Sequence, residues 1–99
     1  MPESKSHTTT ANRIARKYRT EYTEGPGADI STSRVAVEVE PPDTVSDAMV
    51  QLRGYRKPVY IAGTNQEAVE KALEVTKGTS VGVMDNQGNI VKRSTRERG

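Results

Sequence analysis

Apolar and polar residues alternate from Arg34 to Glu40. Val35, Val37 and Val39 would lie on one side, and Glu38 and Glu40 would share the other. A repeat of two residues is typical of a β-strand, because successive side chains point to opposite faces. Pro41 and Pro42 then end the strand. The pattern therefore predicts a strand over 34–40 that carries two carboxylates on one face.

Three segments have helical spacing instead. The first runs from about Thr10 to Arg19, with Thr9 or Thr10 as the N-cap. The second runs from about Asp43 to Tyr55 and places Gln51 and Tyr55, four residues apart, on the same side. The third runs from Thr64 to about Lys77, where Thr64 and Glu67 fit a capping box and Gly78 fits a C-cap.

Short apolar runs lie between and after these helices. Residues 59–62 predict a strand, and 81–84 and 89–91 predict a hairpin around the turn at 85–88. A brief strand is also expected at 20–23, followed by a turn at Gly25-Pro26-Gly27. Strands that alternate with helices indicate an α/β fold, a small three-layer-like sandwich with a mixed β-sheet flanked by helices. We expect a disordered leader over 1–9, one domain over 10–93 and a flexible basic tail over 94–99.

The composition limits the classes of protein to consider. The chain has 99 residues, 32% of them hydrophobic, with no Trp or Phe and a mean hydropathy of -0.76. Such a thin core would gain stability from a homodimer. The absence of Cys excludes disulfides, Cys-based zinc sites and thiol nucleophiles. No segment has the length of a membrane span or the apolar centre of a signal peptide, so we expect a cytoplasmic protein without a membrane partner.

Charge is unevenly distributed along the chain. The net charge is only +2, but basic residues crowd both ends around an acidic middle. This arrangement could steer a polyanion such as DNA, although charged ends also serve solubility alone. The candidate nucleic-acid-binding residues are Arg13, Arg16, Lys17, Arg53, Arg56 and Lys57.

The acidic middle contains a candidate metal site. Asp29 follows the glycine turn, and Glu38 and Glu40 lie on the adjacent predicted strand. Hard cations such as Mg²⁺ or Mn²⁺ bind carboxylate and carbonyl oxygens. We expect Asp29, Glu38 and the backbone carbonyl of Val39 to be ligands, with Glu40 beside them to position or deprotonate a water.

These residues resemble the motifs of the PD-(D/E)XK nuclease superfamily, in which an Asp after a turn precedes a strand bearing Glu-x-Lys. The likeness covers roughly residues 11–83 in the order of elements. The segment Gln51-Leu52-Arg53-Gly54-Tyr55 is similar to the Gln-x-x-x-Tyr helix motif of RecB-like members. The resemblance implies a restriction-endonuclease-like core, metal-dependent hydrolysis of DNA, and catalytic roles for Asp29, Glu38, Glu40, Gln51 and Tyr55, the last two near the phosphate or the water.

Glu40 departs from this pattern, because the family usually has Lys there. A non-catalytic domain that binds nucleic acid or protein on a degenerate nuclease-like fold is therefore the alternative. A third possibility is an unrelated α/β domain whose acids only solubilise its surface; Asp29 and Glu38 would then lie apart. His7, the only histidine, falls in the expected leader, where we predict that it faces solvent.

Overall fold

The computed structural model describes residues 5–23 and 27–97. Its helices and strands follow in the order α1 (Lys5–Lys17), β1 (Ile30–Ser31), β2 (Ala36–Glu40), the 3-10 helix η1 (Pro42–Asp47), α2 (Ala48–Gln51), β3 (Val59–Gly63), α3 (Gln66–Val75), β4 (Gly82–Met84) and β5 (Ile90–Lys92).

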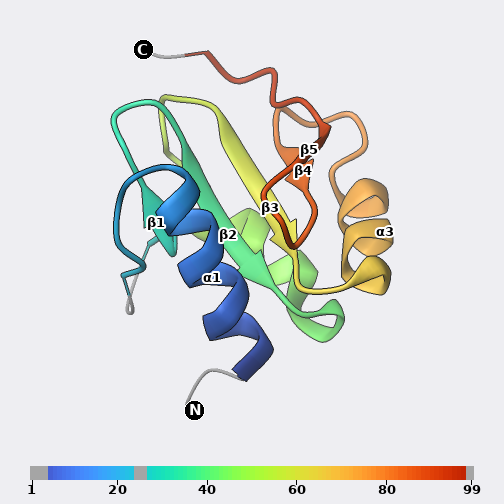
Figure 1. Ribbon diagram of the computed structural model, residues 1–99. Helices are drawn as coiled ribbons and strands as arrows, with labels where there is room; N and C mark the ends of the chain where they lie inside the picture. Colours follow the sequence, from blue (N-terminus) through green and yellow to red (C-terminus); the bar gives the residue numbers. More distant parts are fainter. Residues whose placement is uncertain (1–4, 24–26, 98–99) are drawn as a thin grey trace.

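The strands form one mixed sheet in the order β1-β2-β3-β4-β5. Strands β2, β3 and β4 are parallel, and the outer strands β1 and β5 are each antiparallel to their neighbour. Helix α1 covers one face of the sheet, while η1, α2 and α3 cover the other (Figure 1). The expected fold class, a small α/β sandwich with a mixed sheet between helical layers, is confirmed.

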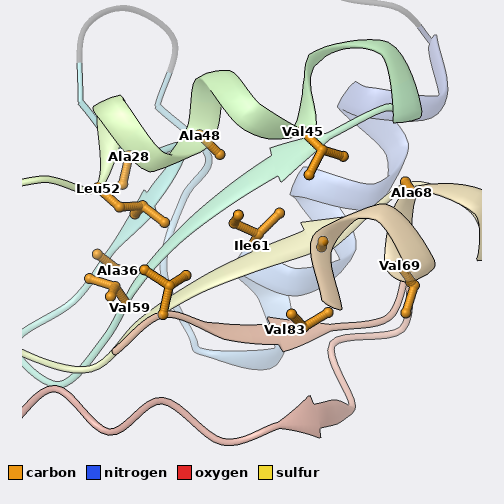
Figure 2. Close-up of a cluster of buried hydrophobic side chains, with 12 residues drawn as sticks. Ala28, Ala36, Val45, Ala48, Leu52, Val59, Ile61, Ala68, Val69 and Val83 are labelled. Carbon is orange, nitrogen blue, oxygen red and sulfur yellow. The ribbon is translucent and has the colours of Figure 1, made fainter. Parts of the chain in front are cut away.

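Each face of the sheet has its own apolar core. Ala36, Val59 and Ile61 pack with Leu52 and Ala72 under η1, α2 and α3, and Figure 2 shows part of this cluster. The opposite cluster lies under α1 and is formed mainly by the following residues: Ala11, Ile14, Ala15, Ile30, Val35, Val37, Val39, Tyr60, Ala62 and Met84. Alternation along β2 thus places Val37 and Val39 toward α1 and Glu38 and Glu40 toward the other layer.

The first helix starts earlier than the sequence suggested. It begins at Lys5, so residues 5–9 do not belong to a disordered leader; residues 1–4 lie outside the described range. His7, in this added turn, is buried and lies 3.1 Å from the Asp29 carboxylate. The brief strand expected at 20–23 is not present, although the Thr23 N–H donates to the Asp29 carbonyl oxygen.

The helix expected over 43–55 is divided. A 3-10 segment precedes the single α-helical turn α2, which ends at Gln51, and Gly54 then has a positive φ of 91°. Tyr55 therefore lies beyond the helix. Helix α3 is capped by Asn65, whose side chain accepts from the Ala68 N–H, so the predicted Thr64 cap was wrong by one residue.

The C-terminal segment is tied down as far as it is described. The Thr95 N–H donates to the Ser80 carbonyl oxygen, and the Arg96 guanidinium donates to the carbonyl oxygens of Leu52 and Tyr55. Residues 94–97 thus make long-range hydrogen bonds where the sequence predicted a flexible tail; residues 98–99 are outside the described part. The hairpin predicted near the end is confirmed as β4 and β5.

Candidate acidic site

Asp29 and Glu38 lie close together at the start of β1, where the preceding loop meets the edge of the sheet. The Asp29 N–H donates to Oε1 of Glu38 at 3.0 Å, and the Val39 N–H donates to Oδ2 of Asp29 at 2.9 Å. The Asp29 carboxylate thus accepts a hydrogen bond from the Val39 N–H, a backbone donor of β2 that would have bonded to β1 if β1 were longer. The two acids converge, which argues against the view that they are unrelated surface groups.

His7 brings α1 into the same cluster. Its Nε2 lies 3.1 Å from Oδ2 of Asp29, and its ring packs edge-on against Tyr22 with centroids 5.7 Å apart. Only 4% of His7 is exposed, so the expectation that it faces solvent was wrong. A signal was available in the sequence, since His7 continues the helical stripe of Ala11 and Ile14 at spacings of four and seven.

Glu40 completes the cluster on the same face of β2 as Glu38. Oε1 of Glu40 accepts from the Thr44 hydroxyl at 2.7 Å. Glu40 and Glu38 are each 8% exposed. Both glutamates project from alternate positions of one strand, as the repeat predicted. The structure thus gathers four ionisable groups from α1, the loop before β1, and β2.

Burial changes the protonation of these acids. Loss of solvation, together with the charges of Asp29 and Glu40, raises the pKa of Glu38 to about 9. Burial also raises the pKa of Glu40 to about 7, although the Thr44 hydrogen bond opposes this change. The pKa of Asp29 is raised by burial as well, in spite of its bonds from Val39 and His7. The cluster therefore retains protons at neutral pH.

The Val39 carbonyl also faces this edge. The Ala36 N–H and the Glu40 carbonyl bond toward β3, to Pro58 and Thr64. Because residues of a strand alternate in the side to which they bond, the N–H and C=O of Val39 project away from β3, toward Asp29. The backbone oxygen proposed as a ligand thus points to the same side as the carboxylate of Asp29.

Gln51 and Tyr55 contact the two peptides that precede Asp29. Oε1 of Gln51 accepts from the Gly27 N–H at 3.3 Å, and the Tyr55 hydroxyl oxygen accepts from the Ala28 N–H at 3.0 Å. Although they are not on one continuous helix, both side chains reach the same two peptides. In this arrangement they fix the loop that carries Asp29.

The residue types of the cluster suit a metal ion, but their arrangement does not form a ready site. Carboxylate and carbonyl oxygens are ligands for Mg²⁺ or Mn²⁺. Among residues 5–23 and 27–97, however, no group of three or more His, Cys, Asp or Glu side chains is arranged to hold a metal ion. The carboxylates instead accept internal hydrogen bonds. Cation binding at this cluster would require some of those bonds to be exchanged.

The candidate nucleic-acid-binding residues fall into two groups. Arg13 and Lys17 donate to the carbonyl oxygens of Asn86 and Gly88, which fastens α1 to the β4–β5 turn. Lys57 donates to Ser31 Oγ and lies 5.3 Å from the centre of the Tyr55 ring. These three have structural contacts. The side chains of the second group are exposed: Arg16, Arg53 and Arg56.

Comparisons with protein-family models, with curated proteins and with solved structures gave no match. The likeness to PD-(D/E)XK nucleases therefore rests on the motifs alone. No helix in the described part of the chain is long and apolar enough to cross a membrane. DNA, a homodimer and a cytoplasmic location stay predictions.

Proposed function

We propose that this chain is a nuclease-like domain that hydrolyses phosphodiester bonds in DNA at the cluster of Asp29, Glu38 and Glu40. One observation supports the proposal above all: His7, Asp29, Glu38 and Glu40 are buried together, although burial disfavours the charged forms of the three carboxyl groups. A fold gains no stability from burying carboxyl groups side by side, and such groups are characteristic of functional sites.

The protonation of the cluster suits cation binding. A divalent cation binds carboxylates in competition with protons, so its binding would release a proton from Glu38. When bound, such a cation would polarise a phosphoryl oxygen of the substrate and lower the pKa of a water molecule. Asp29, Glu38 and the Val39 carbonyl are the groups proposed to hold it.

Glu40 is proposed as the proton acceptor. Its pKa of about 7 leaves it partly ionised at neutral pH, which is the range in which a general base is most effective. The Thr44 hydroxyl holds one of its oxygens. Gln51 and Tyr55 act indirectly in this proposal, because they fix the backbone of Gly27 and Ala28 next to Asp29.

A second candidate function is a non-catalytic domain that binds nucleic acid or a protein. It is favoured by Glu40, which stands where the family usually has Lys, and by the lack of a preformed three-ligand group among the described residues. Under this alternative the acidic cluster would serve only the architecture.

The two candidates are separated by an NMR titration of the ¹⁵N-labelled protein with Mg²⁺, followed by Mn²⁺. The nuclease proposal expects localised shifts or broadening at the amides of Asp29, Glu38 and Val39, and cleavage of at least one DNA in a panel of single-stranded, duplex and branched forms. Glu38→Gln should abolish both effects, and Glu67→Gln, on the exposed face of α3, should abolish neither. DNA binding without a localised metal response or cleavage would favour the non-catalytic alternative.

A further inference from the structure

A hollow of about 450 Å³ lies beside the acidic cluster. One wall is formed by α1, and the others by Thr64, which follows β3, and by Asn86 in the β4–β5 turn. Its lining consists of two cations, four hydroxyl groups and one amide: Lys5, Arg13, Ser6, Thr9, Thr10, Thr64 and Asn86. None of these lining residues is acidic.

The cations and hydroxyls of α1 form one stripe. Lys5, Thr9 and Arg13 are spaced by four residues, which places them one above the other along the helix. Arg13 is also positioned, because its Nη1 donates to the Asn86 carbonyl oxygen at 2.9 Å. Lysine, arginine and hydroxyl groups are the side chains that most often contact phosphate oxygens.

The position of the hollow fits a ligand as well. Thr64 and Asn86 lie just beyond the carboxyl ends of the parallel strands β3 and β4, where open α/β sheets commonly bind ligands. The Thr64 N–H donates to the Glu40 carbonyl oxygen at 3.1 Å, so the hollow adjoins the end of β2 that carries the acids. A chain of phosphates that enters the hollow would continue past the acidic cluster.

We infer that this hollow binds backbone phosphate of a polynucleotide and guides the strand to the acidic cluster, with Lys5, Thr9 and Arg13 as the contacting residues. The identity of the ligand as a polynucleotide rests on the proposed function. The inference replaces the broad basic surface expected from the sequence with one defined path, and it adds Lys5 and Thr9, which the charge pattern did not indicate.

The experiment measures binding of a fluorescent single-stranded oligothymidine by anisotropy, in EDTA and over a range of salt concentrations. Lys5→Gln should weaken binding about three- to tenfold at low salt and reduce the slope of log K against log salt by about 0.7, the value for one lost phosphate contact on a single strand. Thr9→Glu should weaken binding further, because it places a negative charge in the hollow at an exposed helical position that tolerates Glu.

Lys77→Gln is the matched control. It removes the same charge from an exposed side chain after α3, on the other side of the sheet, and should leave affinity and salt slope unchanged. Equal affinity of Lys5→Gln, Thr9→Glu and the wild type would overturn the inference, and so would an equal loss in Lys77→Gln, which would indicate general charge attraction. Because the assay contains no divalent cation and measures no cleavage, failure of the nuclease proposal alone would leave these results unchanged.

Discussion

Nε2 of His7 lies 3.1 Å from Oδ2 of Asp29, although the two residues are 22 positions apart and both are buried. The contact joins the first turn and a half of α1 to the loop before β1. It ties the early start of the helix to the same Asp29 oxygen, Oδ2, that accepts from the Val39 N–H. Stability and site geometry are therefore linked through this pair.

His7→Ala should lower the free energy of unfolding by about 2 kcal/mol, because it leaves a cavity and removes one partner of a buried carboxylate. His7→Gln, which can still donate to Asp29, should lower the free energy of unfolding by less. Urea denaturation measures both. Thr9→Ala, at an exposed position of the same helix, should have little effect. An unchanged urea midpoint in His7→Ala would show that the contact contributes nothing to folding.

The raised pKa values of Glu38 and Glu40 predict how stability depends on pH. Each group binds its proton more tightly in the folded state than in the unfolded chain, where the pKa of a Glu is near 4.5. The folded protein therefore holds more protons, and stability must fall as pH rises from about 4.5 through 7 and toward 9. Below that range this contribution is fully present.

Glu38→Gln should reduce this loss of stability and make the protein more stable than the wild type at pH 8 to 9, by on the order of 1–3 kcal/mol, because glutamine is neutral and its oxygen can still accept from Asp29. Chemical denaturation at pH 5, 7 and 9 tests this. The prediction fails if wild type and variant show parallel pH profiles. Glu67→Gln, an exposed change, supplies the reference.

Tyr55→Phe should lower the free energy of unfolding by about 1 kcal/mol, because the Ala28 N–H loses its hydroxyl acceptor while the ring remains in place. The amide signals of Ala28 and Asp29 should shift in NMR spectra recorded without metal. If the nuclease proposal holds, cleavage should fall without loss of DNA affinity, since the loop that carries Asp29 is then less well fixed. Unperturbed signals at both amides would rule out this positioning role.

Gly27 and Gly54 form a matched pair for testing the same loop. Their φ angles are 90° and 91°, so alanine is strained at both, but only at Gly27 would the new Cβ meet an atom, the Tyr55 hydroxyl oxygen at 3.1 Å. Gly54→Ala should cost about 1–2 kcal/mol from strain alone. Gly27→Ala should cost about 1 kcal/mol more, because it also disturbs the Tyr55–Ala28 hydrogen bond.

Thermal or urea unfolding of the two alanine variants measures this difference. In the Tyr55→Phe background the extra cost of Gly27→Ala should disappear, because the hydroxyl is gone. If Gly27→Ala still costs more stability than Gly54→Ala in the Tyr55→Phe background, contact with the hydroxyl is not the cause of the difference.

Local patterns in the sequence determined much of this protein. The alternation at 34–40 was sufficient to place Glu38 and Glu40 on one face, since a strand's side chains must alternate. Helical spacing located α3 closely and α1 apart from its first residues, 5–9. The order of these elements indicated the layered α/β fold. The terminal hairpin was visible from two apolar runs around a glycine turn, whereas the turn predicted at Gly25-Pro26-Gly27 falls largely on residues 24–26, outside the described part of the chain.

Only the tertiary structure decided which side chains meet and what state they are in. His7 could be assigned to the site only once α1 was packed against the sheet, and Gln51 and Tyr55 reach Gly27 and Ala28 through a fold in which α2 ends early. The protons retained by Glu38 and Glu40 depend on burial, which no local pattern specifies. Periodicity reports the direction of a side chain relative to its own element, whereas contact and loss of solvent depend on segments distant in the chain.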